Sequence, residues 1–265
     1  MKKIIFLAVI VVVALVFIFT KSGNKQMSND KENKTSVADT ASAVSVTPVS
    51  HASMILNWDG MVIYTDPSVY KADNANMFAG KPAPDIILVT DIHSDHLDVE
   101  TLKKIATEKT IIVAPKAAAD QIPKELNLKV SVMNNGEIAD YLGFQIEAIP
   151  MYNILESGTS FHTKGRGNGY VIEKDGERIY ISGDTSGIPE MRNLQNIDMA
   201  FVAMNLPYTM GVEEAADAIL AFAPKKVYPY HYRTPEGFSD VAKFKEIVNS
   251  GNPKIEVVQL EWYPK

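Results

Sequence analysis

The residue types most able to do chemistry are concentrated in one short segment, Asp91-Ile-His-Ser-Asp-His-Leu-Asp98. It directly follows residues 86–90, a largely apolar run that predicts a buried strand. Asp91, His93, Asp95 and His96 lie at positions x, x+2, x+4 and x+5, and short polar side chains on such a turn can converge on one or two cations. The alternative is a solvated acidic loop whose Ser94 or Asp95 caps the next helix. We interpret the segment as a metal-binding loop.

The composition restricts the chemistry further. The 265 residues include no cysteine and only five histidines. Disulfides, thiolate metal ligands and cysteine nucleophiles are therefore excluded, and a metal or catalytic site must use His, carboxylates and other oxygen ligands.

The loop resembles the His-x-His-x-Asp-His signature of the metallo-β-lactamase-fold hydrolases, with Asp91 at the position of the first histidine. The later ligands of that family are matched in order by His162, by Asp184 in a Gly-Asp-Thr turn, and by His231 in Pro-Tyr-His-Tyr-Arg. From His96 onward these positions are 66, 22 and 47 residues apart, which leaves room for intervening strands and helices. The resemblance covers most of the chain from about residue 51 and implies an α+β fold, a four-layer αβ/βα sandwich of two mixed β-sheets flanked by helices.

The resemblance also implies roles for these residues. Asp91, His93 and His162 would form one metal site, Asp95, His96 and His231 the other, and Asp184 would bridge them. The expected cofactors are two divalent ions, Zn²⁺ foremost, with Mn²⁺ or Fe²⁺ as alternatives. A hydroxide between the two ions is the expected nucleophile, because metal coordination lowers the pKa of water from about 15.7 to about 7. Asp95 and Asp184 are the expected catalytic residues, with Asp95 orienting the hydroxide or accepting its proton.

Asp91 departs from the family pattern. A carboxylate in place of an imidazole adds negative charge and makes manganese or iron more plausible beside zinc. If Asp91 does not bind metal, one weak site and a mononuclear enzyme result. A third interpretation is a metal-binding domain without turnover.

The residue at position 184 narrows the range of reactions to expect. The commonest zinc β-lactamases carry a cysteine where this chain has Asp184, so antibiotic hydrolysis is not the expected activity. The segments His51-Ala-Ser, 161–170 and Pro-Tyr-His-Tyr are most similar to the ascorbate-6-phosphate lactonase-like branch. We expect an enzyme that hydrolyses an ester, lactone or phosphodiester bond of a small molecule. A lipid phosphodiesterase of the same superfamily is the alternative.

Six further residues are expected to support the metal ligands or to contact the substrate. Asp66, in Thr-Asp-Pro, resembles the family's Asp-Pro element, which supports the metal loop from behind. His51, at the start of the first predicted hairpin, is either such a support or an ordinary structural histidine. Lys164 and Arg166 can hold a phosphate or carboxylate, or belong to a solvated turn. Tyr208 and Arg233 are pocket candidates by their place in the chain.

The elements that must position these residues are predicted from hydrophobic patterns. Hairpins are expected over 52–57 with 61–64 and over 169–173 with 178–182. Buried strands are expected at 86–89, 111–114, 144–149, 199–202 and 227–230, and helices at 99–107, 212–223 and 239–248. This mixture predicts sheets covered by helices.

The N-terminal end differs from the rest. Residues 4–19 are all apolar and follow Lys2 and Lys3, a pattern typical of a membrane anchor or signal sequence over residues 1–20. The polar residues 21–43 predict a flexible linker, and residues 44–265 the hydrolase domain. We therefore expect an exported, membrane-anchored protein facing the periplasm or the cell exterior; cleavage and secretion is the alternative.

The charge distribution bears on partners. Residues 1–45 hold six lysines and three acidic residues, which leaves 20 basic and 29 acidic residues and a net charge of −9 for the rest of the chain. We therefore expect no nucleic-acid partner and contact with the membrane through the N-terminal segment only.

Overall fold

The computed structural model describes residues 44–70, 76–154 and 160–263. The predicted anchor or signal sequence and the predicted linker lie outside these residues. Within the described part of the chain, no helix is long and apolar enough to span a membrane. The described residues all belong to one structural unit, Ala41–Lys265.

The first sheet has six strands in chain order, with antiparallel pairs from β1 to β3 and parallel pairs from β3 to β6. The turn between β2 and β3 contains Asp59 and Gly60, both at positive φ, as tight hairpin turns require. The strands are β1 (Val44–Ser50), β2 (Ser53–Trp58), β3 (Met61–Thr65), β4 (Ile86–Leu88), β5 (Ile111–Ala114) and β6 (Lys129–Val132).

The second sheet has seven strands in the order β15-β12-β11-β10-β9-β8-β7. Strands β7 to β10 pair antiparallel, whereas β10, β11, β12 and β15 run parallel. The strands are β7 (Ile138–Tyr141), β8 (Phe144–Met151), β9 (Gly167–Lys174), β10 (Glu177–Ile181), β11 (Met199–Ala203), β12 (Lys226–Tyr230) and β15 (Glu256–Val257), and a separate small ribbon contains β13 (Arg233–Thr234) and β14 (Gly237–Phe238).

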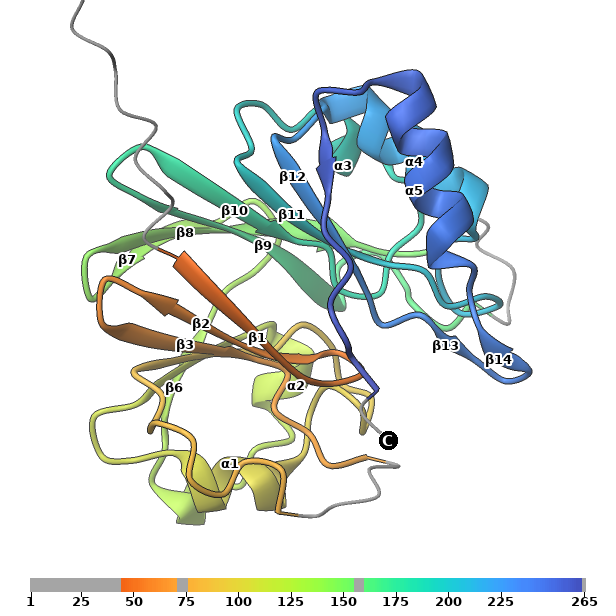
Figure 1. The fold of residues 1–265 in the computed structure, drawn as a ribbon. Coiled ribbons are helices and arrows are strands. Elements are labelled where there is room, and N and C mark those ends of the chain that lie inside the picture. Colours follow the sequence, from red (N-terminus) through yellow and green to blue (C-terminus); the bar gives the residue numbers. More distant parts are fainter. Residues whose placement is uncertain (1–43, 71–75, 155–159, 264–265) are drawn as a thin grey trace, which may run out of the picture. The chain divides into compact units, whose positions relative to one another are not determined.

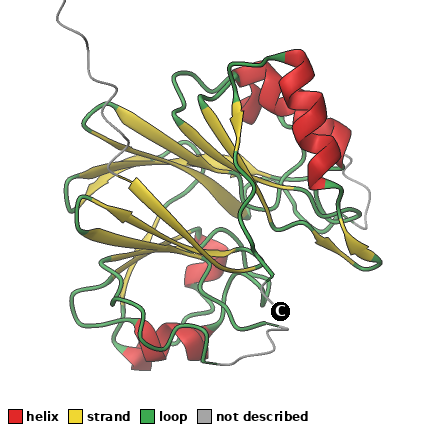
Figure 2. Ribbon diagram, viewed as in Figure 1, coloured by secondary structure: helices red, strands yellow, loops and turns green. Residues whose placement is uncertain are grey.

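The two sheets lie face to face and the helices cover their outer faces (Figure 1, Figure 2). Side chains alternate across each strand, so β4 contributes Ile86 and Leu88 to the core between the sheets, and Ile87 to the outer core beneath α1. The first sheet is covered by α1 (Val99–Ile105) and α2 (Lys116–Ala119), with the short 3-10 helix η1 (Lys124–Leu126) following; the second sheet is covered by α3 (Pro189–Arg192), α4 (Val212–Phe222) and α5 (Val241–Gly251).

The expected αβ/βα sandwich of two mixed sheets is therefore confirmed. The three expected helices correspond to α1, α4 and α5, with α5 beginning at Val241 because the Asp240 side chain caps it by accepting from the Lys243 N–H. One placement was wrong: His51 does not begin a strand. It lies in the turn between β1 and β2 at a φ of 52°, and β1 is a strand that was not predicted from the sequence.

Candidate metal centre

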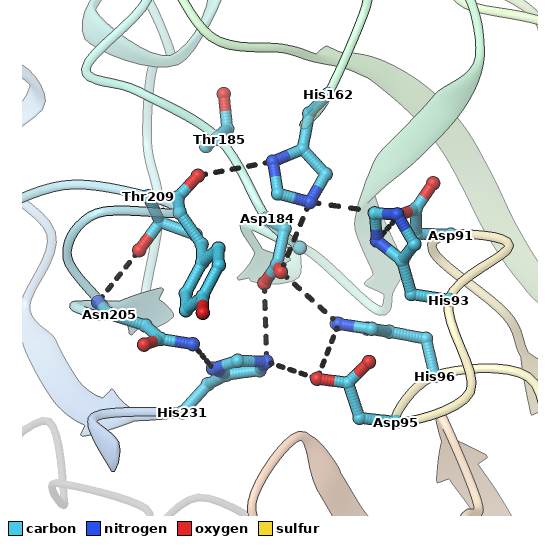
Figure 3. A network of polar contacts seen from close by, with 12 residues as sticks. Asp91, His93, Asp95, His96, His162, Asp184, Thr185, Asn205, Thr209 and His231 are labelled. Carbon is cyan, nitrogen blue, oxygen red and sulfur yellow. Dashed lines mark hydrogen bonds and ion pairs between the residues drawn. The ribbon is translucent and has the colours of Figure 1, made fainter. Parts of the chain in front are cut away.

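The chemically active side chains come from loops that follow the strands of both sheets. The metal loop leaves β4, Asp184 follows β10, and His231 follows β12, while His162 lies in the loop that leads into β9. Figure 3 shows these side chains pointing toward one another around Asp184. The sandwich therefore brings together groups that are up to 140 residues apart, from Asp91 to His231.

Three buried histidines share one arrangement. The Nδ1 atom of each meets a partner outside the centre, and the Nε2 atom of each is buried without a hydrogen-bond partner among the described residues. The outer partners are Asp66 Oδ2 for His96 at 2.8 Å, Asn153 Oδ1 for His162 at 3.1 Å, and the Asn205 side-chain amide for His231 at 3.1 Å. Metal-binding histidines have this arrangement, because the outer hydrogen bond fixes the ring and leaves the inner nitrogen for the ion.

The Asn205 amide fits the same scheme. Its Oδ1 is buried without a partner, while its nitrogen is the atom that faces His231. A 180° rotation of the amide brings Oδ1 to His231 Nδ1, which then donates and leaves Nε2 free for a metal.

Asp184 lies between the three inner nitrogens. Its Oδ2 is 3.3 Å from Nε2 of both His96 and His162, and its Oδ1 is 3.4 Å from His231 Nε2. Among the described residues, three groups have the proximity needed for a metal ion: Asp91 with His93 and His162, His96 with Asp184 and His231, and His51 with Asp95 and His231. This donor set fits divalent cations, because four buried polar atoms, the three Nε2 atoms and Asp184 Oδ1, converge without other partners.

The charges of the centre are strongly coupled. Burial by itself raises the pKa of Asp184, but the charges of His231 and His96 outweigh it and hold this pKa well below its usual value. Burial lowers the pKa of His96, but Asp184, Asp66 and Asp95 raise it well above its usual value, and the pKa of His231 is raised for similar reasons. Without a metal, protons on the imidazoles therefore balance the carboxylates, and cations can replace those protons.

Asp66 lies where the sequence places it, behind the metal loop. Its Oδ1 accepts from the Thr90 N–H at 2.7 Å, and its Oδ2 accepts from Thr90 Oγ1 at 2.6 Å. The same Oδ2 meets His96 Nδ1. One fully buried carboxylate thus fixes both the beginning of the loop and a ligand ring.

Asp91 has two partners of its own. Arg166 donates to both carboxylate oxygens, from Nε to Oδ1 at 3.1 Å and from Nη2 to Oδ2 at 3.0 Å. His93 Nδ1 lies 2.7 Å from Oδ2. Burial raises the pKa of Asp91, but the His93 hydrogen bond and nearby positive charge outweigh it and lower this pKa. Arg166 therefore neutralises a candidate metal ligand, rather than being free to hold a phosphate or carboxylate.

Lys164 is also engaged elsewhere. Its Nζ donates to Glu190 Oε1 at 2.7 Å and lies 4.7 Å from the centre of the Tyr152 ring. Lys164 is absent from the wall of the central cavity, so the structure places it away from the expected phosphate-holding position.

His51 contacts the centre through Asp95. Its Nε2 lies 3.2 Å from Asp95 Oδ2, and its Nδ1 lies 2.8 Å from the Tyr263 hydroxyl. The Tyr263 hydroxyl accepts a hydrogen bond from the Arg233 N–H at 3.1 Å. Among the described residues, the hydroxyl can then donate its proton to His51 Nδ1. Burial, together with the charge of His231, lowers the pKa of His51 to about 4. Neutral His51 then carries its proton on Nε2 and donates to Asp95, which favours a supporting role over metal binding.

A cavity of about 340 Å³ opens onto the centre. Tyr208 and Arg233, both expected pocket residues, lie on its wall. The ring of Phe161 packs edge-on against Tyr208 with centroids 4.7 Å apart, which adds an apolar face. The other residues on the wall are His51, Tyr70, His93, Ser94, Asp95, His162, Asp184, Asn205, Thr234 and Pro235.

The supporting contacts of four residues were not predicted from the sequence: Thr90, Asn153, Asn205 and Tyr263. Asn153 was expected only as a pocket residue by its place in the chain. Thr90 had a local signal, since it lies next to the metal loop and opposite the Asp-Pro element. The contacts of the other three with His162, His231 and His51 span 9, 26 and 212 residues. No local pattern marks such partners.

Comparisons with known proteins agree with this architecture. A model of the beta-lactamase superfamily domain matches residues 45–231. A UPF0173 metal-dependent hydrolase of Thermococcus onnurineus is 33% identical over 184 residues, which cover 67% of this chain and 79% of the relative. A crystal structure of a protein from Parabacteroides distasonis has a TM-score of 0.73 and 36% identity, with coverage of 83% of this chain and 94% of that one.

A metallo hydrolase of Ignicoccus hospitalis, 24% identical, shares the fold with a TM-score of 0.70 over 82% of this chain and 95% of that one. The family model spans well over half of the chain, and the Thermococcus relative is matched over more than two thirds of its length. The chain therefore belongs to the metallo-β-lactamase superfamily of metal-dependent hydrolases.

Proposed function

We propose that this hydrolase cleaves an ester, lactone or phosphodiester bond of a small molecule at a centre of two divalent cations. The observation that carries the proposal is the convergence of three buried, unpartnered Nε2 atoms on Asp184, at the floor of a cavity open to small molecules. Bound cations would supply a nucleophilic hydroxide at neutral pH and stabilise negative charge on the substrate oxygen.

The chain's own residues have distinct roles in this proposal. Asp91, His93 and His162 would hold one cation and His96, His231 and Asp95 the other, with Asp184 placed between the two groups. Asp95 is suited to orient the attacking group or accept its proton, because its side chain is 19% exposed whereas Asp184 is almost fully buried. The neutral imidazoles and hard carboxylate oxygens suit Zn²⁺, Mn²⁺ or Fe²⁺.

Substitution of the ligands tests the proposal. We expect Asp184→Asn and His93→Ala to lose metal and at least about 100-fold in turnover while the fold remains, because metal-assisted activation of water is lost. The measurements are metal content by mass spectrometry, circular dichroism, and hydrolysis of a panel of lactones, esters, thioesters and phosphodiesters. Asp140→Asn, the same change on an exposed strand position, is the control. Full activity in both ligand variants would falsify the assignment of the centre.

Two predictions from the sequence remain proposals. The likeness to the ascorbate-6-phosphate lactonase-like branch is supported by sequence segments alone. Export and membrane anchoring depend on residues 1–20, and we propose that cell fractionation will recover the protein with membranes. Removal of residues 1–43 should release it, and recovery of the full chain in the soluble cytoplasmic fraction would contradict the proposal.

A further inference from the structure

The cavity wall carries one arginine whose guanidinium has no anionic partner among the described residues. The chain has four arginines. Three bind carboxylates: Arg166 binds Asp91, Arg178 binds Glu173, and Arg192 binds Asp217. The fourth, Arg233, follows the candidate ligand His231 by two residues and lines the cavity.

Aromatic rings hold Arg233 in place. Its guanidinium carbon lies 4.5 Å from the centre of the Tyr263 ring and 5.7 Å from the centre of the Phe238 ring. Its backbone N–H donates to the Tyr263 hydroxyl, which is itself bonded to His51. Stacking on an aromatic face leaves the N–H groups at the edge of the guanidinium free for a planar or tetrahedral anion.

The surroundings favour an anion at this position. Among the described residues that line the cavity there is no lysine. Lys164, which follows the candidate ligand His162 by two residues, forms an ion pair with Glu190. Most of the wall away from the candidate ligands is uncharged, including Tyr70, Phe161 and Tyr208. In the proposed function the carboxylates of the floor bind cations, which leaves Arg233 as the positive side chain on the wall of the cavity that a substrate would fill.

We propose that Arg233 binds an anionic group of the substrate, a carboxylate or a phosphate, while the bond to be cleaved lies over the metal centre. The inference depends on the proposed hydrolytic function and adds a substrate class to it: small anionic esters or lactones. A planar guanidinium can donate two parallel hydrogen bonds to either type of anion.

A matched pair of substrates tests this inference with the full, metal-loaded chain. One is the mono-4-nitrophenyl ester of glutaric acid, and the other is the neutral 4-nitrophenyl valerate. We expect the wild type to prefer the anionic ester in kcat/KM, and Arg233→Met to reduce that preference by about 10- to 100-fold, as loss of charge-assisted hydrogen bonds implies. Hydrolysis of the neutral ester should change little. Arg233→Lys keeps the charge without the planar fork and should be intermediate.

Controls separate this inference from the proposed function. Lys116→Met removes one positive charge from an exposed pair with Asp120 and should leave the preference unchanged. Binding of glutarate and of inorganic phosphate, measured by calorimetry in the wild type and Arg233→Met, gives a readout independent of turnover. The anion whose binding weakens in the variant is the one that Arg233 holds.

Three outcomes would overturn the inference: equal rates for the two esters in the wild type, a preference that Arg233→Met leaves intact, or equal losses for both esters. If no ester, lactone or phosphodiester is hydrolysed by the wild type, the proposed function fails instead, and the calorimetric comparison still tests Arg233. If Arg233→Met binds glutarate and inorganic phosphate as tightly as the wild type does, the inference about Arg233 is overturned.

Discussion

At the scale of single residues, the pair of Asp91 and Arg166 explains how the chain accommodates its departure from the family signature. A carboxylate in place of a neutral imidazole adds a negative charge to a fully buried position. Arg166 supplies the compensating positive charge with two hydrogen bonds. The two side chains belong together physically, because a buried carboxylate without a partner is strongly unfavourable.

Breaking the pair of Asp91 and Arg166 should lower the free energy of unfolding by a measurable amount. We expect Arg166→Met to lower the free energy of unfolding of the metal-free protein by about 1.5–3 kcal/mol, since it removes two charge-assisted hydrogen bonds from a buried carboxylate and leaves His93 as its partner. Asp91→Asn in the same chain should recover much of the loss. Arg178→Met, which breaks a partly exposed pair with Glu173, should cost about 1 kcal/mol or less. Denaturant titration measures all four proteins, and equal costs for the two arginines would contradict the argument.

His51 gives a second prediction at this scale. If it donates to Asp95, His51→Ala should lower turnover by about 10- to 100-fold with metal content unchanged, as expected for a group that orients another. His51→Gln keeps an N–H donor and should retain more activity, with a pH profile closer to that of the wild type. Mass spectrometry reports the metal. A metal content reduced by half in both variants would instead make His51 a ligand.

Four of the seven candidate ligands were predicted from the short spacings of the metal loop, and the other three, His162, Asp184 and His231, from the resemblance to the family pattern. Most of the contacts that support them could not be predicted. Arg166 and Asp91 are 75 residues apart and Tyr263 and His51 are 212 apart, and only the folded sheets bring each pair into contact. Arg166 was expected at the site, but its partner was not, because charge alone does not distinguish a substrate from a neighbouring carboxylate.

At the scale of elements, the strands predicted from the sequence are the interior strands of both sheets. The four edge strands, β1, β6, β7 and β15, were not predicted. Interior strands are buried on both faces and form continuous apolar runs, whereas β6 and β7 are mostly exposed or half-buried. Pro48 also weakens the strand pattern of β1 in the sequence, because proline is tolerated in a strand mainly at the edge of a sheet.

The beginning of β9 shows how an element positions the centre. The Asn168 N–H donates to the Thr90 carbonyl at 2.9 Å and the Tyr170 hydroxyl to the Val89 carbonyl at 2.8 Å, which ties the second sheet to the start of the metal loop. A Cβ at Gly169 would lie 2.9 Å from the carbonyl oxygens of both Ile181 and Ser182. Glycine is therefore required for the approach of β9 to the strand that ends near Asp184.

We expect Gly169→Ala to lower the free energy of unfolding by about 1–3 kcal/mol and to weaken metal binding, because backbone atoms must move. Gly165→Asn is the matched control. Its φ of 86° suits asparagine better than most residues, and a Cβ there meets nothing within 4 Å, so we expect a change of about 0.5 kcal/mol or less. Denaturant titration and calorimetric metal titration measure both effects. Equal losses in the two variants would show that local backbone conformation, and not the close approach, is what matters.

At the scale of the whole molecule, folding concentrates opposite charges at one end of the sandwich, and this makes stability depend on pH and metal together. In the metal-free protein, the raised pKa values of His96 and His231 add stability that is fully present below the unfolded value of about 6.5. It is lost as pH rises through the raised values. The lowered pKa values of Asp95 and Asp184 add stability that is present above about 3.8 and is lost as pH falls through the lowered values.

We therefore expect the Tm of the metal-free protein to fall as pH rises from 6.5 to 9, whereas the metal-loaded protein shows little change over that range because its imidazoles are already deprotonated. Metal affinity should decrease toward acid pH, since cations compete with the protons on His96 and His231. Thermal unfolding with and without chelator, and calorimetry in buffers of different ionisation enthalpy, measure the two effects. Asp184→Asn removes the largest favourable charge acting on His96 and should flatten the slope. A metal-free Tm that rises between pH 6.5 and 9 would mean that these histidines are neutral in the folded protein, and the charge balance of the centre would have to be assigned differently.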